Sequence, residues 1–199
     1  MRNSFVFDLS EYTDFTKNMI FFSKNFSHSC ILHSNKSNSF VPKKYYQFDL
    51  ICAFDSIKFL ESSRKSLIKL QELHKERKDW IFGYMSYDLK NELYSTKSDN
   101  ESLFNNKNIG FFIPRHVLII KKNNLIVESI ENKKIVKQLF NTITNYIPDI
   151  KEIQKIKFKY RIGKSKYLDK VMKIKAHIQR GDIYEMNFCQ EFFKENIKL

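Results

Sequence analysis

The strongest constraint on the fold is a change of hydrophobic period near the end of this 199-residue chain. Residues 165–180 place apolar side chains at the spacing of one helical face, namely Tyr167, Val171, Ile174 and Ile178. Gly181 then stands where a glycine commonly ends a helix. Beyond it the period becomes two, as in a strand. We therefore expect a helix over 165–180 and a strand over 183–193, with three side chains facing the core: Tyr184, Met186 and Phe188.

Upstream of this segment, short apolar runs alternate with amphipathic stretches. The apolar runs predict strands at 30–32, 49–54, 79–88, 109–120 and 125–128. Residues 121–124 are the predicted turn of a hairpin between the last two of these strands. Helical spacing predicts further helices at 11–22, 63–78 and 132–147.

Residues 79–88 (DWIFGYMSYD) form the most aromatic of the predicted strands. Aromatic and other strand-forming residues suit a half-buried sheet surface, so we expect this strand to pack against residues 49–54. Gly83 would permit a bend or the close approach of another backbone. Farther along, the charged stretch 149–157 is the predicted boundary between two parts, 1–150 and 151–199.

The charge of the chain invites a nucleic-acid interpretation, because 35 Lys and Arg against 22 Asp and Glu give a net charge of +13. Most of these cations are lysines, whereas bidentate contacts to phosphates and bases favour arginine. The chain is also rich in Asn, Ile and Phe, which, like Lys, are encoded by AT-rich codons. We therefore interpret the lysines as solvated surface residues and expect no nucleic-acid partner.

The chain lacks the sequence patterns of membrane, secreted, zinc-binding and nucleotide-binding proteins. No apolar run approaches the about 20 residues of a membrane span, and the N-terminus lacks the apolar region of a signal peptide. We therefore expect a cytoplasmic protein without a membrane partner. Cys30, Cys52 and Cys189 form no C-x-x-C pair, so neither a zinc site nor a disulfide framework is indicated. The four glycines complete neither a dinucleotide-binding nor a phosphate-binding motif.

Two blocks of the chain carry a family resemblance. Residues 167–192 end in G-D-I-Y-E-M-N-F-C-Q-E-F and resemble the opening of the chorismate-binding domain of anthranilate synthase and aminodeoxychorismate synthase component I. The residues that match are Gly181, Asp182, Ile183, Tyr184, Asn187, Gln190 and Phe192. Residues 80–91 resemble the G-Y-x-x-Y-D-L block of the family's N-terminal domain through Gly83, Tyr84, Tyr87, Asp88 and Leu89. The blocks stand in the family's order and at about its spacing.

The resemblance implies an α+β fold of orthogonally packed antiparallel sheets with outer helices. It implies that residues 1–150 are the family's N-terminal domain and that residues 151–199 connect to the start of the catalytic domain. The implied reaction is the Mg²⁺-dependent replacement of a chorismate hydroxyl by ammonia. A separate glutamine amidotransferase subunit supplies the ammonia.

The resemblance also supplies two candidate site residues, Glu185 as a catalytic group and Asn187 as a substrate-binding group. The family's amine-adding members carry Gln at the position of Glu185, and its water-adding members carry Lys as the base that activates water. A carboxylate cannot act as that cationic amine, so Glu185 argues against the water-adding branch. The alternative for Glu185 is an exposed strand carboxylate without a catalytic role.

Residues 59–62 (FLES) resemble the family's L-L-E-S element, which binds feedback tryptophan. Here these residues directly precede a predicted helix, so Ser62 or Ser63 is the simpler N-cap. Asp88 and Asp182 are likewise interpreted as cap or turn formers rather than acid groups.

The family's later blocks, which carry its catalytic His and the Glu residues that hold Mg²⁺, have no counterpart in these 199 residues. We therefore expect a truncated chain that is inactive alone. If the chain is an enzyme, the run Y-D-L-K-N at 87–91 followed by G-D-I-Y-E-M-N-F-C-Q-E-F at 181–192 resembles aminodeoxychorismate synthase component I more than anthranilate synthase component I. The former lies on the p-aminobenzoate and folate route. The remaining alternatives are an inactive fragment and, as the weakest, a basic nucleic-acid-binding protein.

Overall fold

A computed structural model describes residues 1–35, 47–94, 96, 106–150 and 156–195 of the chain. The chain divides into two compact units, Met1–Asp149 and Ile150–Leu199. The predicted assignment of 1–150 and 151–199 to the family's two domains stays a prediction.

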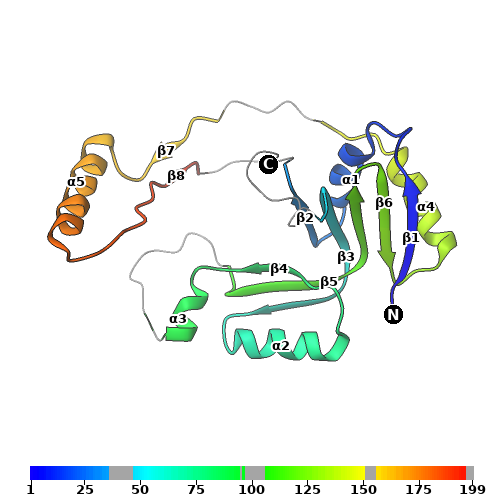
Figure 1. Ribbon diagram of the computed structural model, residues 1–199, viewed down its shortest axis with the longest axis horizontal. Coiled ribbons are helices and arrows are strands. Elements are labelled where there is room, and N and C mark those ends of the chain that lie inside the picture. The colour runs from blue at the N-terminus through cyan, green and yellow to red at the C-terminus, as the bar shows by residue number, and fades with distance from the viewer. Residues whose placement is uncertain (36–46, 95, 97–105, 151–155, 196–199) are drawn as a thin grey trace. The chain divides into compact units, whose positions relative to one another are not determined.

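The first unit is built on a six-stranded antiparallel sheet (Figure 1). Five strands follow one another across it in the order β1 (Asn3–Asp8), β6 (Asn124–Ser129), β5 (Ile109–Lys121), β3 (Leu50–Ser62) and β2 (Ser29–His33). A sixth strand, β4 (Phe82–Met85), pairs with β5. The predicted α+β class with antiparallel pairing and outer helices is confirmed, and the predicted hairpin of β5 and β6 is present.

Strand β3 is longer than the predicted strand at 49–54 because it continues through a bulge. The register with β5 shifts between Ser56 and Lys58, and Asp55 has a positive φ of 61°. A bulge increases the local bend and twist of a strand. Figure 1 shows both long strands turning here, so that one half of β5 pairs with β6 and the other half pairs with β4. The packing of two separate sheets at right angles stays a prediction.

The main core lies between one face of this sheet and two helices, α1 (Phe15–Ser23) and α4 (Lys133–Thr144). Its fully buried members include Met19 from α1, Phe54 from β3 and Ile143 from α4. Helix α4 begins at its N-cap Asn132, whose side chain accepts a hydrogen bond from the backbone N–H of Ile135. Helix α1 begins four residues later than predicted, after a turn over 9–14.

A second buried cluster uses the alternate residues of the same strands. Its members are Ala53, Phe82, Phe112, Val117 and Ile119. Ala53 and Val117 are paired across β3 and β5 and are fully buried, which shows that the sheet is apolar on both faces at this point. Two further helices belong to the first unit, α2 (Ser66–Arg77) and α3 (Leu89–Tyr94). They contribute the buried Leu73 and Leu89.

The second unit consists of α5 (Lys164–Arg180) and two short strands, β7 (Lys159–Tyr160) and β8 (Phe192–Phe193). The predicted helix is confirmed, and Gly181 ends it with a left-handed φ of 82°. The two strands pair with each other in an antiparallel sense.

The predicted strand over 183–193 is wrong except at Phe192 and Phe193. The exposed fraction is 94% for Tyr184 and 52% for Met186, so these two side chains do not face a core as predicted. The physical reason is the lack of a pairing partner, because a strand persists only where a neighbour satisfies its backbone groups. Within the described part of this unit, β7 is the only strand that pairs with the segment, and it is two residues long.

Candidate functional site

The two predicted site residues lie on the irregular segment after α5. Glu185 and Asn187 are both exposed and flank Met186. Among the described residues, neither side chain has a hydrogen bond or ion pair. The structure therefore places them together on one short segment but does not bring another predicted site residue to them.

Asp182, at the start of this segment, closes the end of α5. Its Oδ2 accepts hydrogen bonds from Arg180 Nε and Nη2, at 3.1 and 2.8 Å, and lies 2.7 Å from His177 Nδ1. The hydrogen bonds from Arg180, followed by that from His177, hold the pKa of the Asp182 carboxyl below its ordinary value. The backbone N–H of Asp182 also donates to the carbonyl of His177. The interpretation of Asp182 as a turn former is confirmed.

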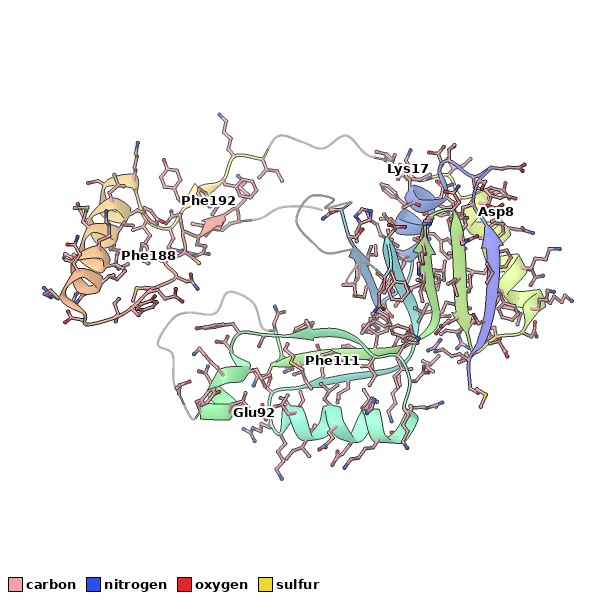
Figure 2. All side chains as sticks on the ribbon, viewed as in Figure 1. Asp8, Lys17, Glu92, Phe111, Phe188 and Phe192 are labelled. Atoms are coloured by element: carbon pink, nitrogen blue, oxygen red, sulfur yellow. The ribbon has the colours of Figure 1, made fainter. Side chains whose placement is uncertain are left out.

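The later half of the segment folds back toward β7 and the start of α5. Phe188 stacks on Tyr167, with ring centroids 5.1 Å apart, and Gln190 Nε2 donates to the carbonyl of Ile162 at 2.8 Å. Figure 2 shows Phe188 and Phe192 on this returning stretch. A cavity of about 490 Å³ lies here, lined by Tyr160, Ile162, Lys164, Tyr167, Gln190 and Phe192.

Sequence reasoning missed this cavity. Gln190 and Phe192 match the family motif, but the period of two over 183–193 does not indicate that the chain returns to Tyr160 and Tyr167. A detectable signal is the density of aromatic residues at both ends of the unit.

The second family-like block, in the first unit, is a site of close backbone packing. A Cβ added to Gly83 would lie 2.0 Å from the carbonyl oxygen of Gly110, and one added to Gly110 would lie 2.5 Å from the Tyr84 ring. The expectation that Gly83 permits close approach is confirmed. The expected packing of this strand against residues 49–54 is confirmed at Phe82, although the strand itself pairs with β5. Only Phe82 of β4 is buried, and it shares a cluster with Ala53.

Glu92, labelled in Figure 2, directly follows this block and links α3 to α2 by hydrogen bonds. The carboxylate of Glu92 accepts hydrogen bonds from the backbone N–H and the hydroxyl of Ser66, at 2.5 and 2.7 Å, and from Asn108 Nδ2 at 3.2 Å. These hydrogen bonds lower the pKa of Glu92, and the bond from the Ser66 hydroxyl has the largest effect. Asp88 precedes α3 directly, at the position of a helix cap.

Residues 59–62 (FLES), which resemble the family's tryptophan-binding element, lie at the end of β3, near the hydrogen bonds of Glu92. Ser62 is buried, and its hydroxyl donates to the carbonyl of Arg64 and accepts from Arg64 N and Lys69 Nζ. The residue before α2 is Lys65, in a left-handed conformation. The predicted N-cap role of Ser62 or Ser63 is therefore wrong. Ser62 instead stabilises the turn that leads into the helix, because its hydroxyl satisfies backbone groups of that turn.

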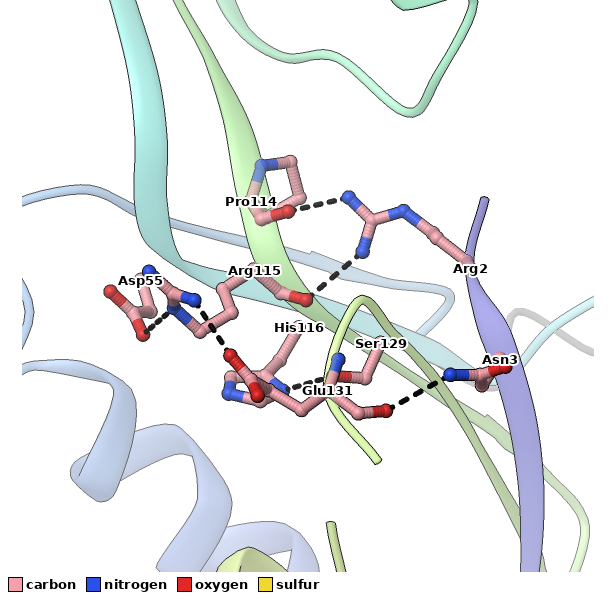
Figure 3. Close-up of polar contacts among 8 residues, drawn as sticks. All are labelled: Arg2, Asn3, Asp55, Pro114, Arg115, His116, Ser129 and Glu131. Atoms are coloured by element: carbon pink, nitrogen blue, oxygen red, sulfur yellow. Dashed lines mark hydrogen bonds and ion pairs between the residues drawn. The ribbon is translucent and has the colours of Figure 1, made fainter. Parts of the chain in front are cut away.

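A third polar cluster pins the N-terminus to the bend of the sheet (Figure 3). Arg2 donates to the carbonyls of Pro114, Arg115 and Glu128 and forms an ion pair of 2.6 Å with Asp79. Its side chain is only 9% exposed. Because these partners are backbone groups and a structural carboxylate, the cluster is a fixation point of the fold.

Beside it, Arg115 bridges the carboxylates of Asp55 and Glu131 at 2.9 and 2.7 Å (Figure 3). His116 is buried, with its Nδ1 2.9 Å from the Ser129 hydroxyl. Desolvation by burial lowers the pKa of His116 to about 4, so this imidazole is neutral at pH 7. No local pattern in the sequence indicates this cluster, because it joins three separate segments of the chain, at residue 55, at residues 115–116 and at residues 129–131.

Comparison with known proteins adds a decisive observation. The family model of chorismate binding enzymes matches residues 21–196, which include both family-like blocks. The chain belongs to the chorismate binding enzyme family. A comparison with curated proteins gives no match.

Among the described residues, the donor set does not fit the Mg²⁺ ion that the resemblance implies. Within the described ranges, no group of three or more His, Cys, Asp or Glu side chains is arranged to hold a metal ion. In the same described ranges, no helix is both long enough and apolar enough to cross a membrane.

Proposed function

We propose that this chorismate binding enzyme acts in the amination of chorismate, as component I of an aminodeoxychorismate synthase. The observation that carries the proposal is the run 181–192 within the matched range, which follows the family's G-D-I-Y-Q-x-N-x-x-Q-x-F pattern except that Glu185 replaces its first Gln. Glu185 stands in it where the water-adding branch carries a Lys base. A glutamine amidotransferase subunit is the proposed source of ammonia.

Glu185 does not reproduce the Lys base of the water-adding branch, and its carboxylate can accept a hydrogen bond from the nucleophile of an amination. An ionised carboxylate only accepts hydrogen bonds, and ammonia or ammonium offers N–H donors to it. Its exposure leaves the carboxylate open to such a donor. Asn187, two residues on and also exposed, offers both an amide N–H donor and a carbonyl acceptor to the substrate.

We further propose that these 199 residues do not catalyse the reaction alone. Glu185 and Asn187 could supply a few hydrogen bonds, each worth about 1 kcal/mol net. Enzymes lower activation barriers by roughly 8 kcal/mol or more. Within the described chain, no metal site accompanies the two residues. Their contribution is therefore recognition rather than turnover.

An assay with chorismate, ammonium and Mg²⁺, followed by fluorescence detection of aromatic amine, tests this part of the proposal. The purified chain is expected to yield no product above the protein-free control. A Mg²⁺-dependent product that Glu185→Ala abolishes, while Asp169→Ala on α5 retains it, would make the chain a minimal enzyme. Asp169 is a suitable control because it is an exposed carboxylate of the same unit.

Growth complementation with the complete natural gene distinguishes the two amine-adding reactions. Aminodeoxychorismate synthase activity is expected to restore growth of a p-aminobenzoate auxotroph that retains its own amidotransferase. Rescue of a tryptophan auxotroph lacking anthranilate synthase component I would favour the alternative, anthranilate formation. Rescue of neither strain by a soluble, expressed protein would leave the inactive fragment as the better interpretation.

A further inference from the structure

We propose that the groove between α2 and β4 in the first unit binds an unbranched carboxylate that carries an apolar chain of medium length. The groove has a volume of about 390 Å³, and its lining residues come from α2, from β4 with the residue before it, and from β5: Leu67, Leu70, Gln71, His74, Ile81, Met85 and Phe111. Cavities of about 300 to 1,000 Å³ are typical of small-molecule sites. Neither Glu185 nor Asn187 belongs to this unit, so the inference does not depend on the proposed reaction.

The groove exists because α2 is fixed to the sheet along one narrow side. Ser66 and Leu73 are the buried residues of this helix. Figure 1 shows α2 beside the half of the sheet that β3, β5 and β4 form, with β4 running back in the opposite direction. Gly83 of β4 pairs with Phe111, which Figure 2 labels, and a Cβ at this glycine would lie 2.8 Å from the Phe111 ring. The missing side chain therefore leaves the ring uncovered on the groove side.

The groove changes from apolar to polar along its length. Only four residues connect α2 to β4, so Ile81 lies near the end of α2 that carries His74. Met85, at the far end of β4, lies toward the beginning of α2, where Leu67 lines the groove. A ligand that fits this gradient has an apolar tail at the Leu67 end and a polar head at the His74 end.

The polar end of the groove carries positive charge. Lys75 and Lys78 are exposed, and within the described residues their side chains form no ion pair or hydrogen bond. The carboxylates of α2 lie on another side of the helix, where Glu76 pairs with Lys58 and Glu72 precedes Glu76 by one turn. Positive charge beside an apolar wall selects a ligand with an anionic head.

Two lining residues at this end supply hydrogen-bond donors for the head. The Gln71 amide and the His74 imidazole both carry N–H groups, and neither side chain has a hydrogen bond among the described residues. Lys78 stands next to them, because its backbone N–H donates to the carbonyl of His74 at 2.7 Å. A carboxylate accepts such bonds through both of its oxygens and complements the lysine charge. A carboxylate is therefore the head group that this end of the groove fits best.

The spacing of the lining residues along α2 sets the length of the apolar chain. Leu67 and His74 are seven positions apart, which corresponds to about 10 Å along a helix. An extended chain advances about 1.2 Å per bond, so a carboxylate of about eight carbons spans this distance. Its methylenes would bury apolar surface against the walls of the groove. Octanoate is therefore the probe.

A ¹H–¹⁵N NMR titration of the full 199-residue chain with octanoate tests the assignment. We expect saturable shifts at the amides of α2, β4 and Phe111. Octan-1-ol, which has the chain without the charge, is expected to bind about threefold to fivefold more weakly, as for the loss of an exposed ion pair. Butyrate, which has four methylenes fewer, is expected to bind more than about tenfold more weakly.

Two double variants with the same change of charge provide the matched comparison. Lys75→Gln with Lys78→Gln is expected to weaken octanoate binding about threefold to fivefold and to leave octan-1-ol binding unchanged. Lys134→Gln with Lys137→Gln, at the same spacing on α4 and outside the groove lining, is expected to bind both ligands like the wild type. All four lysines are exposed, so neither double variant removes a buried group.

A methionine pair tests the apolar end. Met85→Glu places a carboxylate against the ligand chain and is expected to weaken the binding of both octanoate and octan-1-ol more than about fivefold. Met172→Glu on α5 is the control, since Met85 and Met172 are 53% and 65% exposed. Circular dichroism confirms that both variants retain the secondary structure of the wild type.

The inference is overturned if octanoate does not bind saturably, if octan-1-ol binds as tightly as octanoate, or if the two double lysine variants behave alike. Saturable shifts confined to another part of the chain also overturn it. Sedimentation velocity covers a different occupant of the groove. A dimer that Met85→Glu dissociates, in the absence of octanoate binding, would identify a second copy of the chain there and would contradict the carboxylate assignment. None of these results bears on amination, which the chorismate assay and the complementation test measure separately.

Discussion

The two units of the chain differ in how completely they bury their apolar side chains. In the first unit, β3 and β5 place fully buried residues on both faces of one sheet. In the second unit, α5 has a clear helical pattern but no buried residue. Leu118 of β5 is 1% exposed, whereas Leu168 of α5 is 50% exposed. Hydrophobic period therefore reports which residues share a face, while burial depends on a second element that covers that face.

A Leu→Ala substitution in each unit is expected to show the largest difference in the free energy of unfolding. Leu118→Ala is expected to lower the free energy of unfolding by about 3 to 5 kcal/mol, because it removes buried methyl groups and leaves a cavity. Leu168→Ala is expected to cost under about 0.5 kcal/mol, as at an exposed position. Urea unfolding monitored by Trp80 fluorescence and circular dichroism measures both. Equal losses would mean that α5 is buried in solution.

The second test compares an arginine from each unit. Arg2→Met is expected to lower the free energy of unfolding by about 2 to 4 kcal/mol, because it leaves Asp79 and several backbone carbonyls without their buried donor. Arg180→Met removes a 2.8 Å pair with Asp182, in which the two side chains are 61% and 46% exposed. An exposed pair is expected to contribute under about 1 kcal/mol. A small effect of Arg2→Met in the same urea titration would contradict the anchoring role.

The third test uses pH. Burial lowers the pKa of His116 from 6.5 to about 4, so the unfolded chain binds the proton more readily than the folded one. Above about pH 6.5, the neutral His116 therefore does not reduce the free energy of unfolding. As the pH falls toward 4, the free energy of unfolding is expected to decrease by about 2 to 3 kcal/mol, since one pKa unit corresponds to about 1.36 kcal/mol.

Unfolding free energies at about pH 7 and pH 4.5 check this expectation. The wild type is expected to lose about 2 kcal/mol more than His116→Gln over that interval. His177→Gln in the second unit is the control substitution, since the side chain of His177 is 51% exposed. Parallel curves for the wild type and His116→Gln would show that the imidazole is hydrated in the folded chain.

The smallest expected effect concerns the end of α5. Gly181→Ala is expected to destabilise the last turn by about 1 kcal/mol, because a residue with a Cβ is strained at a φ of 82°. Apart from the glycine itself and its two chain neighbours, no atom of the described residues lies within 4 Å of the added Cβ, so the effect is one of backbone conformation. Gly181→Asn is expected to lose less, since Asn tolerates the left-handed region better. Amide hydrogen exchange of α5 distinguishes them, and equal protection in both variants would contradict the explanation.

Local signals in the sequence predicted the fold well where one short segment contains all that an element requires. Helix α5 and Gly181, the hairpin of β5 and β6, and the close approach at Gly83 follow from spacing and residue type within a few positions. The strand predicted at 183–193 failed because pairing requires a partner elsewhere in the chain. For the same reason, the site prediction found Glu185 and Asn187 from a motif but missed the cavity around Gln190.

The sequence by itself determined most of the order of helices and strands, the hairpin turn between β5 and β6, and the membership of the chorismate binding enzyme family. These depend on local backbone preferences and on motifs that are continuous in the chain. Only the tertiary structure decided that β4 pairs with β5, that Arg2 meets the carbonyl of Arg115, and that Gln190 returns to Ile162. Gln190 and Ile162 are 28 positions apart in the chain, and Arg2 and Arg115 are 113 apart. Such long-range contacts depend on the packing of the whole unit, which no local pattern specifies.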